Sequence, residues 1–173
     1  AAHWDEPVTK VTSDGWLNSI NTNLSACIYA CRDVSRHFIA QGSGSILIVG
    51  STAAHSPMPS ETGYRVSKAG LKPYMELLAV ELAPYNIRAN MITPGYLPTK
   101  VSADIIGDRE DEILDHIPLH RAGNPEDWGN AAAFLLSDQL SAYTTGSELL
   151  IDGGFHMRPP TLFSRDEIRE MNA

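Results

Sequence analysis

The feature that most constrains the fold is a short, uninterrupted apolar run at residues 45–50, Ser-Ile-Leu-Ile-Val-Gly, which lies between two stretches of helical periodicity. Continuous rather than alternating apolarity is typical of a strand that is buried on both faces, as in a parallel sheet. Further strands are expected at 87–93 and at 147–151. The order of strand, helix and strand with short connections indicates a βαβ unit, so the chain is predicted to be an α/β protein with parallel strands.

Three helices are expected between and around these strands. Apolar residues at spacings of three and four predict a long amphipathic helix over 14–41, which ends at the turn formed by residues 42–44. A second helix is predicted over 64–84. It contains Pro73, which should remove one hydrogen bond and kink the axis at a cost of about 3 kcal/mol. A third helix should begin at the N-cap Asn124, with Pro125 in its first turn, and end near residue 137.

The remaining segments have weaker patterns. Residues 96–121 carry six carboxylates and no clear periodicity, and a loop of that length inside a domain is usually a functional lid or disordered. A C-terminal tail covers about 155–173, where Ser164 and Glu167 fit a capping box for one or two helical turns. We treat residues 1–173 as one domain.

Composition excludes several classes of protein and partner. The chain has 173 residues, 43% of them apolar, and can therefore bury roughly 70% of the surface that the unfolded chain exposes. The 21 acidic against 13 basic residues give a net charge of -8, which disfavours nucleic acid as a partner. No apolar run approaches the roughly 18 residues of a membrane span, and the first residues lack the pattern of a signal peptide. We expect a cytoplasmic protein in a reducing setting.

Two cysteines, Cys27 and Cys31, lie four residues apart on the first predicted helix and so share one of its faces. This spacing could form half of a metal site or a redox pair, but two small buried side chains are the more ordinary interpretation. No third or fourth ligand follows at a metal-binding spacing, and the six histidines are scattered without an HExxH motif. No metal is expected.

The residues that could perform chemistry gather at the ends of the predicted strands. Tyr64 and Lys68 are four apart at the start of a helix, so their side chains lie about 6 Å from each other. A neighbouring ammonium favours the phenolate, and we expect Lys68 to lower the pKa of Tyr64 toward neutrality. Ser51 directly follows the first strand, where open α/β sheets bind their ligands. Two further candidates are Asn23, an amide in the middle of the long first helix, and the segment 94–99 after the next strand.

These pieces together resemble the compact, single-domain short-chain dehydrogenases/reductases. The matching motifs are Asn23 in Asn-Thr-Asn-Leu, the arrangement Ser-x12-Tyr-xxx-Lys, Pro-Gly-xxx-Thr at 94–99, and the closing segment from Thr-Gly at 145–146 to Asp-Gly-Gly at 152–154. The resemblance covers residues 14–154. It implies the C-terminal part of a doubly wound, Rossmann-like parallel sheet with about three strands and flanking helices.

The resemblance also implies an NAD- or NADP-dependent oxidoreductase that transfers a hydride to or from a carbonyl or alcohol carbon. Tyr64 is then the general acid/base and Ser51 holds the substrate oxygen. Lys68 lowers the pKa of the tyrosine and contacts the nicotinamide ribose, and Asn23 anchors a water chain. The turn at Pro94 and Gly95 and the hydroxyl of Thr99 would contact the nicotinamide carboxamide.

The family's glycine-rich phosphate loop and the residue that chooses between NAD and NADP are not in this sequence. About three βα units and a fourth strand would precede residue 1 in a complete member. Two interpretations follow: a part of a complete reductase, or a truncated non-catalytic module that serves in oligomerisation or binding. A strand at 45–50 without its neighbour would expose a sheet edge, so we expect the 173-residue piece alone to be poorly soluble or molten.

The substrate is expected to be a small molecule. The acidic residues of 96–121 disfavour strongly anionic substrates such as acyl-CoA, although a solvated run of charges explains them as well. The tail beyond residue 154 is similar to those of sugar and polyol dehydrogenases, which favours a sugar, a polyol or a small hydroxyketone. By resemblance, the first two helices form the surfaces of a homodimer or homotetramer.

Overall fold

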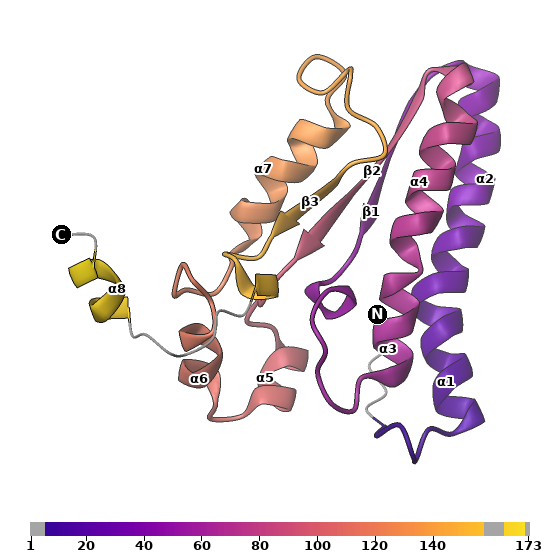
Figure 1. The fold of residues 1–173 in the computed structure, drawn as a ribbon. Helices are drawn as coiled ribbons and strands as arrows, with labels where there is room; N and C mark the ends of the chain where they lie inside the picture. Colours follow the sequence, from indigo (N-terminus) through magenta and orange to yellow (C-terminus); the bar gives the residue numbers. More distant parts are fainter. Residues whose placement is uncertain (1–5, 158–164, 172–173) are drawn as a thin grey trace.

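A three-stranded parallel sheet organises the computed structural model, which describes residues 6–157 and 165–171 (Figure 1). The strands are β1 (Gly44–Val49), β2 (Ile87–Pro94) and β3 (Glu148–Ile151), with β2 in the centre. Ile46 pairs with Ala89, and Met91 pairs with Glu148. The predicted strands and their parallel direction are confirmed, with boundaries that differ by at most one residue.

Helices cover both faces of this sheet (Figure 1). One layer consists of α1 (Ser13–Ile20), α2 (Ala26–Gln41), α3 (Thr62–Ala69) and α4 (Leu71–Leu82). The opposite face is covered by α7 (Pro125–Leu136). Two short helices, α5 (Lys100–Ile106) and α6 (Glu110–Asp115), lie beyond the carboxyl ends of the strands. The last helix is α8 (Arg165–Met171), and single 3-10 turns occur at Thr52–Ala54, Ala83–Tyr85 and Phe155–Met157.

The core follows this layering. The larger apolar cluster lies between the sheet and the layer of α2 and α4, and its most buried members are Leu71, Met75, Ile87, Ala89 and Met91. A smaller cluster lies between the sheet and α7 and consists of Ile92 of β2 with Trp128 and Leu135 of α7. β2 is buried along its length, as expected of a strand in the middle of a parallel sheet.

The expectation that the run at 45–50 is buried on both faces is only half right. Ile46 and Ile48 are buried, but the side chain of Val49 is 50% exposed. The reason is position: β1 is an outer strand that pairs only with β2 within the described residues. The sheet edge that was expected at 45–50 is therefore present, and the central strand of this sheet is β2.

The two long predicted helices are each divided. The first, expected over 14–41, contains a π-helical turn at Asn21–Ser25 between α1 and α2. The second, expected over 64–84, divides at Gly70 into α3 and α4. Pro73 therefore lies in the first turn of α4, where a backbone N–H has no partner within the helix. The predicted cost of a proline inside a helix does not arise.

Helix α7 begins as predicted. The side-chain oxygen of Asn124 accepts from the backbone N–H of Asp127 at 2.9 Å, and the Asp127 carboxylate accepts from the N–H of Asn124 at 3.0 Å. At the other end, the buried Arg88 of β2 donates to the carbonyl oxygen of Leu135 at 2.7 Å. A charged side chain is accommodated in a buried strand because it satisfies carbonyl groups that the helix end leaves open.

The segment 96–121 is not the long loop that its weak pattern predicted, because it contains α5 and α6. Helix α5 begins with a capping box between Thr99 and Ser102, a signal that the absence of apolar periodicity concealed. In the tail, a short helix is present at α8 as predicted. The predicted cap Ser164 lies outside the described residues.

Candidate active site

The ends of the three strands bring the predicted residues to one edge of the sheet. Ser51 follows β1 in an extended conformation and caps the 3-10 turn Thr52–Ala54, because its Oγ accepts from the N–H of Ala53 at 3.2 Å. Gly95 follows β2 and donates its N–H to the carbonyl oxygen of Ile151 at 3.0 Å. A Cβ at position 95 would lie 2.6 Å from Asp152 Cα. Only glycine allows the two strand ends to approach this closely.

Helix α3 carries Tyr64 and Lys68 and packs tightly against α1. A Cβ at Gly63 would come within 2.8 Å of the side chain of Ser19, so glycine is required at this contact. The Nζ atom of Lys68 lies 5.9 Å from the centre of the Tyr64 ring, in agreement with the predicted helical spacing. The close contact with α1 fixes where both side chains project.

Asn23 lies within the π-helical turn and is buried, with 6% of its surface exposed. The backbone N–H of Ala26 bonds to the carbonyl oxygen of Asn21, five residues earlier, which defines the turn. Turns of this kind inside α-helices are frequent at functional sites. The odd placement of an amide in the helix, noted from the sequence, thus coincides with a local departure from α-helical geometry.

The pKa of Tyr64 shifts in the direction opposite to the one expected from the sequence. Burial raises the pKa of the phenol above its ordinary value, the hydrogen bond with Ser51 lowers it, and the charge of Glu61 raises it, with burial the largest effect. The expectation that Lys68 sets the direction is therefore wrong. Proximity of an ammonium along a helix does not outweigh the loss of water around the phenol.

Lys68 is itself partly removed from water. Burial lowers the pKa of its ammonium group, and the charge of Cys27 on α2 opposes this effect. Its Nζ donates to the carbonyl oxygen of Val49 at 3.1 Å. An ammonium has three donors, so Lys68 can bridge the end of β1 and a further acceptor.

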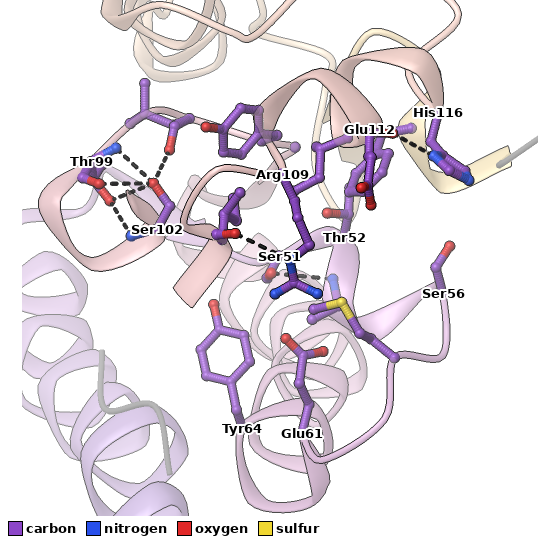
Figure 2. A pocket seen from close by; sticks show the side chains of 18 residues that line it. Ser51, Thr52, Ser56, Glu61, Tyr64, Thr99, Ser102, Arg109, Glu112 and His116 are labelled. Atoms are coloured by element: carbon purple, nitrogen blue, oxygen red, sulfur yellow. Dashed lines mark hydrogen bonds between the residues drawn. The ribbon is translucent and has the colours of Figure 1, made fainter. Parts of the chain in front are cut away.

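A cavity of about 520 Å³ opens beside these groups (Figure 2). Of the predicted residues, Ser51, Tyr64, Gly95 and Thr99 line it. Lys68 lines a second cavity of about 240 Å³, which shares Ser51 with the first. Asn23 and Pro94 are not among the described residues that line either cavity. Thr99 is exposed, and its hydroxyl caps α5 by accepting from the N–H of Ser102 at 3.1 Å.

The structure adds residues that the sequence did not reveal. Glu61 and Arg109 extend into the larger cavity near Tyr64 and Ser51 (Figure 2). Glu61 is the residue directly before α3 and three residues before Tyr64, so its closeness in the chain was the only signal available in the sequence. Arg109 carried no such signal, because its position depends on the turn between α5 and α6. Further lining residues that the sequence analysis did not single out include Met58, Tyr96, Glu112, His116 and Phe155.

The acidic residues of 96–121 are exposed, which agrees with a solvated run of charges. Glu112 lines the cavity, and Glu110 accepts from the hydroxyl of Tyr96 at 2.9 Å.

Within the described part of the chain, no helix is both long and apolar enough to cross a membrane. The same residues contain no group of three or more histidine, cysteine or acidic side chains suited to a metal ion. Cys27 and Cys31 are free thiols.

Comparison with known proteins agrees with this geometry. A protein-family description, "Enoyl-(Acyl carrier protein) reductase", matches residues 1–156. The 3-oxoacyl-[acyl-carrier-protein] reductase of Chlamydia pneumoniae is 40% identical over 150 residues, which are 87% of this chain and 60% of that protein. The chain thus spans about three-fifths of the length of this relative.

Solved structures with the same fold include dehydrogenases of other substrates. A gluconate 5-dehydrogenase from Burkholderia cenocepacia, in complex with NADP and tartrate, superposes with a TM-score of 0.86 at 26% identity, over 91% of this chain and 62% of that one. An acetoin dehydrogenase from Enterobacter cloacae gives 0.82 at 27% identity, over 94% and 64%. The sheet, the Ser51, Tyr64 and Lys68 arrangement and these matches lead to one conclusion: the chain belongs to the short-chain dehydrogenase/reductase family.

Proposed function

We propose that this protein is an oxidoreductase that transfers a hydride between NAD or NADP and the carbonyl or alcohol carbon of a small molecule. The observation that carries the proposal is that Ser51 and Tyr64 line the same wall of the larger cavity, next to the smaller cavity that Lys68 lines. A substrate oxygen that enters this cavity can contact both hydroxyls. One of them then holds the oxygen while the other exchanges a proton with it.

In the reducing direction, Tyr64 donates its phenolic proton to the oxygen of the substrate. The raised pKa of Tyr64 keeps the phenol protonated at neutral pH, so the proton that the reduction consumes is present on Tyr64. Ser51 keeps the oxygen in place through its hydroxyl. In the oxidising direction the same two residues act in reverse, and Tyr64 must first lose its proton.

A bound nicotinamide would supply or accept the hydride. Lys68 fits a ribose hydroxyl, because its ammonium has donors beyond the one that Val49 accepts. Gly95 and Thr99 line the larger cavity, and together with Pro94 at the end of β2 they would contact the carboxamide. Asn23, buried in its π-helical turn beside α3, would anchor the water through which Lys68 exchanges protons with solvent.

The substrate that we favour is a sugar, a polyol or a small hydroxyketone. Hydroxyl side chains line the cavity together with Glu61 and Arg109, and a carboxylate and a guanidinium can accept from and donate to neighbouring hydroxyl groups. Two of the matching structures are named as a gluconate and an acetoin dehydrogenase. The 3-oxoacyl-[acyl-carrier-protein] reductase among the relatives indicates the competing class of substrates, thioesters of 3-oxoacids.

We also propose a homodimer or homotetramer that uses α2 and α4. Large apolar side chains are exposed on these helices, namely Tyr29, Leu77 and Val80. Exposed apolar residues that cluster on one face favour burial against another subunit. Light scattering after size-exclusion chromatography should give a multiple of the subunit mass, and a monomer at micromolar concentration would contradict this part of the proposal.

The function is tested with the protein expressed from its complete reading frame. Oxidation of NADH and NADPH is followed with acetoin and keto-sugars, reduction of NAD and NADP with polyols and aldonic acids, and acetoacetyl thioesters serve as the competing substrates. We expect turnover with one of the hydroxylated compounds. Turnover restricted to thioesters would contradict the substrate class, and no turnover with any pair would contradict the oxidoreductase activity.

A further inference from the structure

A buried carboxylate outside the proposed catalytic group lies at the start of β3. The side chain of Glu148 is 6% exposed and lines the smaller cavity, which Ser51 and Lys68 also border. Burial of a carboxylate is unfavourable unless hydrogen bonds and opposite charges compensate it. The buried carboxylate of Glu148 therefore requires partners that stabilise its charge.

Three different elements contact this carboxylate. One oxygen, Oε1, accepts from the hydroxyl of Thr93 on β2 at 2.6 Å and lies 2.6 Å from Nε2 of His55. The other, Oε2, lies 3.2 Å from Nζ of Lys72 on α4. Hydrogen bonds from these three residues keep the pKa of Glu148 below its ordinary value even though burial opposes them. Glu148 thus stays ionised and joins β2, β3, α4 and the loop after β1.

Two of these partners are close in the chain to the proposed catalytic residues. His55 lies four residues after Ser51, on the loop that supplies Ser51 and Thr52 to the larger cavity. Lys72 lies one helical turn after Lys68, across the division at Gly70. A displacement of Glu148 would release both the Ser51 loop and the start of α4.

A second set of contacts holds the same loop at the other end of β3. The hydroxyl of Ser56 donates to the carbonyl oxygen of His156 at 2.9 Å, and Nδ1 of His156 lies 2.7 Å from the Asp152 carboxylate. The rings of His55 and His156 meet edge to face, with centres 6.5 Å apart. The loop that carries Ser51 is consequently held against both ends of β3, and at one of them the contact is between His55 and the Glu148 carboxylate.

We propose that Glu148 is a positioning residue for the proposed hydride-transfer reaction: through His55 and Lys72 it fixes the hydroxyl of Ser51 relative to Tyr64 and Lys68. This inference rests on the proposed function. A displacement of about 1 Å in a reacting constellation can lower turnover by 10²-fold. Glu148→Gln keeps the size of the side chain and an acceptor for Thr93, but removes the charge that holds His55 and Lys72.

The test is a double-mutant cycle in the protein from its complete reading frame, with Glu148→Gln and Ser51→Ala alone and combined. We expect Glu148→Gln to lower kcat about 10- to 100-fold, with the KM for the nicotinamide cofactor little changed. In the Ser51→Ala background the same substitution should lower kcat less than about threefold, because the hydroxyl that it positions is already absent. Glu76→Gln, an exposed carboxylate on α4, is the matched control and should leave kcat unchanged.

Equal losses in both backgrounds would overturn the inference while leaving the proposed function intact, as would wild-type turnover by Glu148→Gln. A wild-type protein without turnover would overturn the proposed function and this inference with it. If Glu148→Gln does not fold, Lys72→Met removes one contact of the same carboxylate from a side chain that is 47% exposed. Lys72→Met should lower kcat when Ser51 is present and should leave kcat of the Ser51→Ala protein unchanged. A Lys72→Met protein with the kcat of the wild type would count against the inference.

Discussion

Ser51 and Tyr64, thirteen residues apart in the sequence, line the same cavity, and the influence of Ser51 on the pKa of the Tyr64 phenol opposes the effect of burial. Burial is the stronger influence, so the pKa of Tyr64 lies above its ordinary value of 10.0. The proton that a carbonyl reduction requires is therefore retained on Tyr64 throughout the neutral range.

A titration can measure this directly. In the protein from its complete reading frame, the tyrosinate absorbance of the wild type minus that of Tyr64→Phe isolates one phenol, and we expect less than half of it to be ionised at pH 10. Ser51→Ala removes the hydrogen bond that lowers the pKa, and should shift the titration of Tyr64 to still higher pH. A midpoint below pH 10, or a downward shift in Ser51→Ala, would contradict this account.

The contact between the ends of β2 and β3 predicts a difference between two glycines. Gly95→Ala places a Cβ 2.6 Å from the backbone of Asp152 and should destabilise the protein by about 1–3 kcal/mol. Gly129→Ala, in the interior of α7, meets no atom within 4 Å and should raise stability by about 0.5–1 kcal/mol. Denaturant unfolding measures both, and a Gly95→Ala protein as stable as the wild type would contradict the predicted close contact.

The two cysteines should differ in reactivity. A hydrogen bond from Cys31, with a further contribution from the charge of Lys68, lowers the pKa of Cys27 to about 7, while the same hydrogen bond and burial raise the pKa of Cys31. The thiolate of Cys27 forms as the pH rises through 7, and it is the thiolate that reacts. Iodoacetamide at pH 7.5, followed by peptide mass spectrometry, should modify Cys27 first.

Cys31→Ala supplies the control for this labelling. Without the hydrogen bond, the pKa of Cys27 should return toward 9.0 and its modification at pH 7.5 should slow. Equal labelling of both thiols in the native protein would show that neither is selectively activated.

Much of the candidate site could be predicted from local patterns. Parallel strands end at one edge of a sheet, so Ser51 and Gly95 could be expected to meet, and helical spacing brought Tyr64 and Lys68 together. The cap at Asn124 was equally local, and the structure confirms it.

Features that depend on contacts distant in the chain could not be predicted. His55 and Glu148 are 93 residues apart, and no periodicity links them. The pKa of Tyr64 depends on how deeply the surrounding residues bury it, which neighbouring positions in the sequence do not reveal. The π-helical turn at Asn23 has the same apolar spacing as an ordinary helix, so the pattern at 14–41 predicted a continuous one.

The central claim is that Tyr64 is the proton donor at a carbonyl-reducing site, and the most direct test is the turnover of Tyr64→Phe in the protein from its complete reading frame. Phenylalanine keeps the ring and removes only the hydroxyl. We predict a loss in kcat of about 10²- to 10⁴-fold, with the fold and the affinity for the nicotinamide cofactor retained. Turnover of Tyr64→Phe within about threefold of the wild type would contradict the assignment.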